Sequence, residues 1–137
     1  MRRAALVAAL LAGCGDAKPD LALGQKIYAQ HCAVCHGAKL EGQPNWQQRL
    51  PSGRMPAPPH DESGHTWHHT DEVLFGITKH GLVPPYAPRD YQSDMPAFGG
   101  TLSDDDIRAV LAYIKSRWTS PELLAARAEM MRNMEKR

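Results

Sequence analysis

The sequence feature that most constrains this chain is a pair of cysteines, Cys32 and Cys35, with His36 directly behind them. This spacing is typical of covalent haem attachment. Each thiol can add to one haem vinyl group, because a short helical turn places both sulfurs along one haem edge, and the histidine can then offer a ring nitrogen to the iron. The alternatives are a redox Cys-x-x-Cys pair, which needs a βαβ context, or half of a zinc site, which needs a second Cys or His pair. The motif predicts one covalently bound haem.

The length, charge and cysteine count agree with one small domain built around such a group. A chain of 137 residues can bury a modest core, to which a covalent haem would add a large apolar body. The formal charge is +1 with acids and bases well mixed, so composition indicates neither nucleic-acid binding nor a polybasic membrane patch. Three cysteines are an odd number for disulfides. If Cys32 and Cys35 hold haem, Cys14 has another role.

The N-terminal segment, residues 1–13, is predicted to be a secretory signal peptide. Two arginines precede nine apolar residues and a glycine, and that run is too short for a bilayer, which takes about 20 residues. The sequence Leu-Ala-Gly-Cys14 also looks like a bacterial lipobox, which predicts that Cys14 is lipidated and becomes the new N-terminus. A plain signal peptide with an incidental cysteine is the alternative. Residues 14–20 would then be the lipidated cysteine and a short polar tether.

The rest of the chain has helical periodicity in four places and no convincing strand alternation, which predicts an all-α fold. The first helix follows Asp20, which can cap it, and leads into the haem motif. The second begins at Thr70 and stops at Gly81. Ser103 caps the third and clearest helix, where three aspartates suit the helix dipole. A fourth helix begins at Ser120, with proline at its first position.

Two stretches between these helices, residues 37–69 and 82–102, have no sustained period and are expected to be long loops. Wrapping a haem would give loops of this length a function. The second loop holds Met95, which a proline follows, and this methionine is the best candidate for the sixth iron ligand because a thioether favours ferrous iron. Met55, also followed by proline, is the competing candidate. A histidine or an open iron site are the remaining alternatives.

Residues 24–118 resemble a class I cytochrome c of the small bacterial type. The resemblance rests on Gly24 and Tyr28 in the first helix, on the haem motif, on Met95 with its proline, and on Ala112-Tyr113-Ile114 in the last core helix. It implies the cytochrome c fold, in which the N- and C-terminal helices cross nearly at right angles, beside a short middle helix and haem-wrapping loops.

The resemblance also implies the site and the domain limits. The cofactor would be one covalently bound haem c, with His36 as the proximal and Met95 as the distal iron ligand. Gly24 and Tyr28 would pack against Val110 and Tyr113. The cytochrome domain would span residues 21–119, and residues 120–137 would form a C-terminal amphipathic helix outside the family core.

The expected function is that of a one-electron carrier, not an enzyme, lipid-anchored through Cys14 on the periplasmic side of a bacterial membrane. Its partners would be a redox protein donor and a redox protein acceptor, with no nucleic acid. One alternative is a haem peroxidase, which needs a labile Met95 and a distal acid–base residue. Another is a metal-binding or sensor protein, since His65 and His68 could chelate copper or zinc. Histidines that hydrogen-bond each other, the backbone or a haem propionate are the preferred interpretation of the group His60, His65, His68, His69 and His80.

Overall fold

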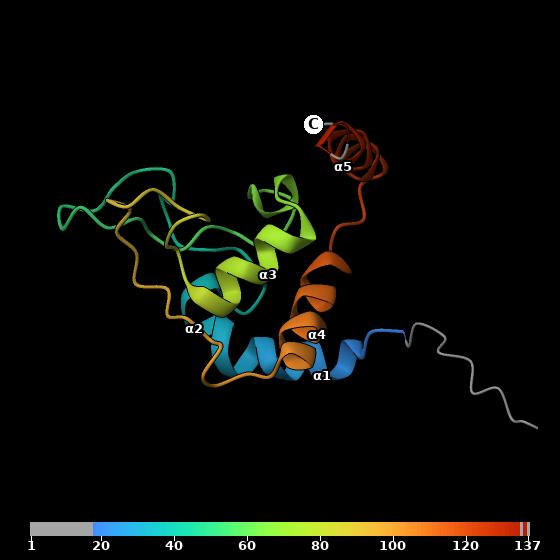
Figure 1. Ribbon diagram of the computed structural model, residues 1–137, viewed down its shortest axis with the longest axis horizontal. Coiled ribbons are helices and arrows are strands. Elements are labelled where there is room, and N and C mark those ends of the chain that lie inside the picture. Colours follow the sequence, from blue (N-terminus) through green and yellow to red (C-terminus); the bar gives the residue numbers. More distant parts are fainter. Residues whose placement is uncertain (1–17, 135, 137) are drawn as a thin grey trace, which may run out of the picture.

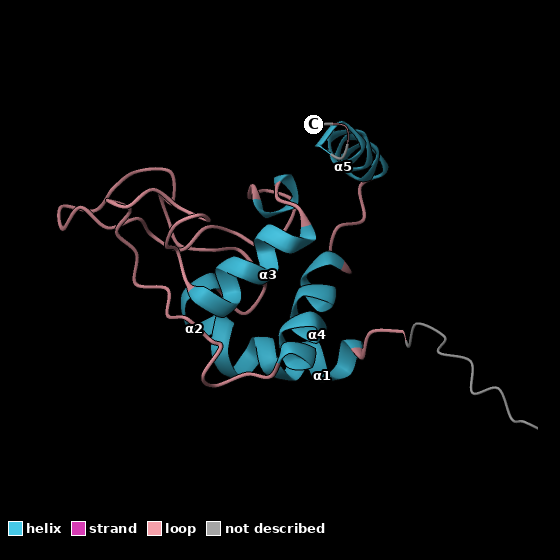
Figure 2. Cartoon of the chain, in the orientation of Figure 1, coloured by secondary structure: helices cyan, strands magenta, loops and turns pink. Residues whose placement is uncertain are grey.

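The computed structural model describes residues 18–134 and 136, and within them it contains helices and loops but no β-strand (Figures 1 and 2). The predicted all-α fold is confirmed. The predicted signal peptide and Cys14 lie outside the described residues, as does most of the tether. The helical elements in chain order are α1 (Leu21–Ile27), the π-helical turn η1 (Tyr28–Cys32), α2 (Ala33–His36), the 3-10 turn η2 (Thr66–His68), α3 (Asp71–His80), α4 (Asp104–Lys115) and α5 (Pro121–Met134).

Three helices begin where the sequence places their caps. The Asp20 carboxylate accepts a hydrogen bond from the backbone N–H of Leu23 at 2.9 Å, and the Thr70 hydroxyl accepts one from Val73 at 3.2 Å. At α4, Ser103 and Asp106 cap each other reciprocally, side chain to backbone N–H in both directions. These side chains satisfy N–H groups that the first turn of a helix leaves without partners.

The N-terminal helix delivers the haem motif by way of a wider turn. α1 passes through η1 directly into α2, so the chain is helical from Leu21 to His36. A π-helical turn inside an α-helix is uncommon and occurs often at functional sites. Here it ends at Cys32, and α2 carries Cys35 and His36.

α1 packs across α4, and this crossing forms the base of the fold (Figure 1). Gly24 is buried at the contact, where the Ala109 carbonyl oxygen and the Tyr113 side chain approach its Cα so closely that no Cβ would fit. The Tyr28 and Tyr113 rings lie 5.6 Å apart. Tyr113 therefore lies against both Gly24 and Tyr28, as predicted, and the Ala109 carbonyl is a further contact of Gly24. Val110, the other predicted partner, is buried in the same core cluster as Tyr28, with an exposure of 1%.

The core joins the helices to the loops. Trp118 follows α4, is buried, and donates from its indole nitrogen to the His60 carbonyl oxygen at 3.0 Å. The His60 N–H in turn donates to the Leu40 carbonyl at 2.8 Å. The buried hydrophobic residues of the cluster are Ile27, Tyr28, Leu40, Leu74, Leu102, Ile107, Val110, Ile114 and Trp118.

α5 stands at the margin of the molecule, where Figure 1 shows it end-on beyond α3 and α4. None of its residues is buried, and Leu124 and Met134 are 44% and 47% exposed. Leu123 packs against the core, and Arg127 makes polar contacts with the segment that holds η2, a turn that lies within the predicted loop 37–69. Among the described residues, no helix combines the length and apolar character that crossing a membrane requires.

Candidate haem site

A cavity of about 260 Å³ lies between α2, α3, α4 and the two long loops. Cys32, Cys35, His36 and Met95 all line it, so the structure brings together every predicted site residue within the described part of the chain. Cys14 lies outside that part. The helices contribute an apolar wall, made of Leu74, Ile77, Val110, Leu111 and Ile114. A mostly apolar cavity with a few polar groups is the form expected of a cofactor site.

The two cysteines are half-buried thiols at the cavity wall, and no disulfide joins them. Burial, helped by the neighbouring Cys35, raises the pKa of the Cys32 thiol to about 11. A redox Cys-x-x-Cys motif needs the opposite shift, because its attacking thiol must have a lowered pKa to exist as the thiolate. The raised pKa therefore disfavours a redox motif.

His36 is held in the tautomer that a metal ligand needs. Its Nδ1 lies 2.7 Å from the carbonyl oxygen of Pro58, and since a carbonyl only accepts, Nδ1 must carry the proton. Nε2 is then left with a free lone pair. Burial lowers the pKa of the His36 imidazole, with the Pro58 hydrogen bond opposing this in part, so the ring is neutral at pH 7. A backbone carbonyl behind the ligating histidine also fixes the ring orientation. These residues fit a haem.

A second histidine, His60, lies flat against the first. The His36 and His60 ring centroids are 3.7 Å apart with an interplanar angle of 19°, and Tyr28 meets His60 edge-on at 5.9 Å. Burial, together with His36 and His65, lowers the pKa of His60 well below its usual value, so this ring is also neutral. The sequence placed His60 only in a histidine-rich stretch. Neither this stacking nor the role of Pro58 has a local signal, because the partners are more than twenty residues apart.

Met95 and its competitor Met55 both line the cavity. The Met95 N–H donates to the Ser93 hydroxyl at 3.0 Å, and shortly after it the Phe98 N–H donates to the Thr78 carbonyl of α3, also at 3.0 Å. Met55 lies close by, because its N–H donates to the Gln92 carbonyl at 3.2 Å. Met55 precedes the segment whose Pro58 carbonyl supports His36, whereas Met95 comes from a segment that is hydrogen-bonded to α3.

The arginine before Met55 was not singled out from the sequence. Arg54 donates to the Ser93 carbonyl at 2.9 Å and pairs with the Asp94 carboxylate at 2.7 Å. It therefore joins the two loops immediately before Met95. No local pattern could have revealed this contact, which spans about forty residues.

Three side chains of the histidine-rich stretch pack on aromatic rings instead of converging on one point. His65 stacks on Trp46 at 5.2 Å and meets His69 edge-on at 5.3 Å, while His80 stacks on Tyr86 at 6.1 Å. Within residues 18–134 and 136, no three His, Cys, Asp or Glu side chains are grouped so that they could hold a metal ion. His65 and His69 do line the haem cavity.

Comparison with known proteins agrees with this site. Residues 21–118 match the family described as cytochrome c. The chain is 32% identical to the cytochrome c6 of Leptolyngbya boryana over 95 residues, which cover 69% of this chain and 89% of the relative. It is 26% identical to the cytochrome c6 of Diacronema lutheri over 102 residues, or 72% of this chain and 96% of the relative.

A longer relative is a thiosulfate dehydrogenase of Stutzerimonas stutzeri (strain A1501), 32% identical over 116 residues. The match covers 82% of this chain but only 33% of that protein, so the chain spans about a third of its length. No solved structure matches the chain. The family match covers well over half of the sequence and includes the helices, the motif and the methionine loop that form the cavity. The chain therefore belongs to the cytochrome c family and binds haem c covalently, with Cys32, Cys35 and His36 as its attachment motif.

Proposed function

We propose that this protein is a one-electron carrier whose haem iron is bound by His36 on one side and Met95 on the other. The observation that carries the proposal is that a neutral His36, with Nδ1 tied to Pro58, lines the same apolar cavity as Met95. When bound, haem c supplies an iron centre that alternates between the ferric and ferrous states. Two protein ligands leave no open position for a substrate.

The residues of the cavity suit electron transfer more than catalysis at the haem iron. The apolar side chains of α3 and α4 exclude water, and a dry environment together with a thioether ligand favours ferrous iron and raises the reduction potential. His36 keeps one orientation because its Nδ1–H donates a hydrogen bond to the Pro58 carbonyl. The segment around Met95 is tied to the other long loop through Arg54 and to α3 through the Phe98 N–H.

The ligand assignment is tested by replacing each methionine separately. We expect Met95→Ala to abolish the methionine-to-iron charge-transfer band, to lower the midpoint potential, and to create peroxidase-like turnover by opening the iron. Met55→Ala is the matched control, since this methionine lines the same cavity, and it should keep the band. The opposite pattern would assign the ligand role to Met55.

The finer part of the proposal concerns where the carrier works. We infer that residues 1–13 are a signal peptide and that Cys14 is lipidated, which anchors the protein on the periplasmic side of a bacterial membrane. Stable anchoring takes two or more acyl chains, which a lipoprotein cysteine usually carries. A flexible tether of the six residues 15–20 would span about 13 Å, from about 5–6 Å times the square root of its length. That distance would raise the effective concentration of the haem domain near membrane-bound redox partners.

Fractionation of cells tests the anchor. Wild-type protein should be found with the membrane, and Cys14→Ser should be left unprocessed at the lipobox. Wild-type protein found in the soluble periplasmic fraction would refute the anchor and leave the electron-transfer role intact.

The partners we propose are a redox protein donor and a redox protein acceptor. The two cytochrome c6 relatives support a carrier, whereas the name of the third relative is that of an enzyme acting on thiosulfate. One observation favours the peroxidase alternative: His65 and His69 line the haem cavity and could act as an acid–base residue. Hydrogen peroxide turnover by the wild-type protein, lost on His69→Ala with the charge-transfer band intact, would support that alternative. We expect the wild type to be inactive.

A further inference from the structure

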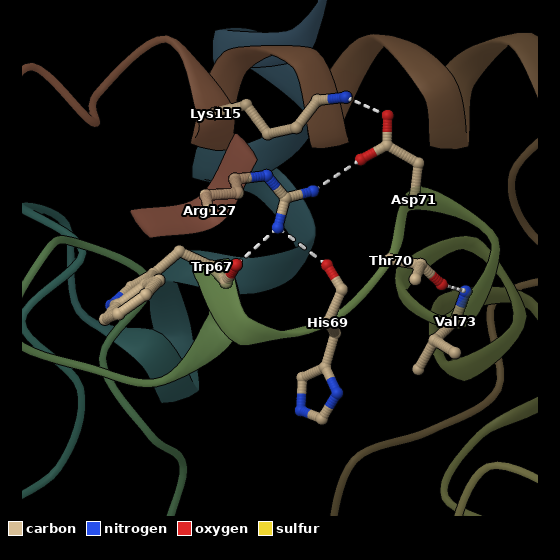
Figure 3. A network of polar contacts seen from close by, with 7 residues as sticks. All are labelled: Trp67, His69, Thr70, Asp71, Val73, Lys115 and Arg127. Atoms are coloured by element: carbon tan, nitrogen blue, oxygen red, sulfur yellow. Dashed lines mark hydrogen bonds and ion pairs between the residues drawn. The ribbon is translucent and has the colours of Figure 1, made fainter. Parts of the chain in front are cut away.

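One side chain of α5 reaches back to the wall of the haem cavity. Arg127 donates from Nη1 to the carbonyl oxygens of Trp67 and of His69, the latter at 2.7 Å, and its Nη2 pairs with the Asp71 carboxylate at 2.8 Å (Figure 3). Its guanidinium also lies 5.1 Å from the ring centroid of Trp118. The side chain is only 12% exposed. These contacts use the planar fork of arginine, which a lysine could not reproduce.

The carboxylate that Arg127 contacts, Asp71, pairs with a second basic side chain. Asp71 is the first residue of α3, and its other oxygen accepts a hydrogen bond from Lys115 at the end of α4. Figure 3 shows Asp71 between Lys115 and Arg127, with the carbonyls of Trp67 and His69 on the far side of the guanidinium. Helices α3, α4 and α5 therefore meet at one ion-pair network, and the apolar wall of the cavity comes from the first two of them.

The carbonyls that Arg127 holds belong to a short segment of that wall. His65, Thr66 and His69 line the cavity, and the segment is closed by two turn hydrogen bonds, from His68 to His65 at 3.0 Å and from His69 to Thr66 at 3.2 Å. Its start is also tied to the α4–α5 junction, since the Glu62 carboxylate accepts from the Ser120 N–H at 2.8 Å. The Thr66 hydroxyl also donates to the Pro59 carbonyl at 3.2 Å, so Arg127 is one of several attachments that set the position of this segment.

We propose that Arg127 is a positioning residue of the haem cavity, which fixes the Trp67–His69 backbone so that this wall stays closed to water. The proposal rests on the proposed function of the haem as a one-electron carrier. α5 lies beyond residues 21–118, which match the cytochrome c family. The Arg127 contacts therefore come from a part of the chain outside the family match. A wall that excludes water raises the reduction potential of the iron, because solvent stabilises the more highly charged ferric state.

The experiment compares haem-loaded Arg127→Ala and Arg127→Lys with wild type. Arg132→Ala is the matched control, since Arg132 is an exposed arginine of the same helix. The first readout is hydrogen exchange at the amides of His68 and His69, which Arg127→Ala should accelerate by about tenfold or more through the loss of two charge-assisted hydrogen bonds. The second readout is the midpoint potential, which should fall in the same variant. Arg127→Lys should give smaller shifts of both, and Arg132→Ala neither.

Each outcome bears on the proposal. Unchanged exchange in Arg127→Ala would overturn it, and so would faster exchange with an unchanged potential, which would reduce Arg127 to a structural role outside the cavity. If Arg127→Ala fails to accumulate, the comparison of Arg127→Lys with Arg132→Ala decides by the same two readouts. A failure of the proposed function is recognised separately, because wild-type protein would then lack the methionine charge-transfer band whatever the amides show.

Discussion

Replacing Gly24 by alanine should destabilise the protein at the α1–α4 crossing. A Cβ at this position would lie 2.2 Å from the Ala109 carbonyl oxygen and 2.8 Å from the Tyr113 Cβ. Real Cβ contacts are essentially never shorter than 3.0 Å, so the two helices would have to separate by about 0.8 Å. The atom in the way is backbone, which cannot rotate aside.

The size of the effect follows from two opposing contributions. Overpacking a well-packed contact costs about 1–3 kcal/mol, and a clash with backbone belongs at the upper end. The better helix propensity of alanine returns about 1 kcal/mol. We therefore expect a net loss of about 2 kcal/mol in the free energy of unfolding. With a urea m-value of about 1–3 kcal/mol/M, the midpoint should fall by roughly 1 M.

The assay is urea denaturation of the haem-loaded protein followed by circular dichroism, with Gly76→Ala as the control. Gly76 is also buried in a helix, but a Cβ there would meet the far end of the Tyr86 ring, which can move. The control should lose clearly less stability than Gly24→Ala. Equal midpoints for the two variants, or a wild-type midpoint for Gly24→Ala, would refute the reasoning that backbone proximity sets the cost.

Three further predictions concern a helix cap, a carboxylate and the methionine loop. Ser103→Ala removes one half of the reciprocal cap of α4 and should cost about 1 kcal/mol in urea denaturation, whereas Ser52→Ala in an exposed loop should cost nothing measurable. Hydrogen bonds from the backbone of Ser120 and Thr119 lower the pKa of the Glu62 carboxyl. Its stabilising contribution is therefore fully present above the ordinary value of 4.5 and is lost as the pH falls through the lower folded-state value. Glu62→Gln should remove this part of the acid sensitivity. The measurement is amide exchange of α5 relative to the intrinsic rate at each pH, and the loss of protection between pH 5 and pH 3 should be smaller in the variant. An unchanged pH profile would contradict this prediction. Arg54→Ala should speed the replacement of Met95 by cyanide in the ferric protein by a few-fold, because a surface pair with side chains 45% and 69% exposed contributes about 1 kcal/mol at most. Arg89→Ala, which changes an exposed arginine of the loop 82–102, should not change that rate. High salt should narrow the difference between Arg54→Ala and wild type.

The sequence by itself determined the features that depend on neighbouring residues. Asp20, Thr70 and Ser103 cap helices because each side chain reaches an N–H three residues ahead. The haem motif is equally local, since Cys32, Cys35 and His36 lie on two successive turns that end one helix. The all-α fold follows from the same short-range periodicity.

Only the tertiary structure decided how the site is completed. The His36 tautomer depends on a carbonyl at Pro58, twenty-two residues away, and the stacking of His60 on His36 depends on how that loop folds back. The sequence predicted an amphipathic helix over residues 120–137, but not that Arg127 of α5 would bind carbonyls about sixty residues before it. Such partners are chosen by the packing of the whole chain, because a backbone carbonyl is the same chemical group at every residue and leaves no mark in the sequence.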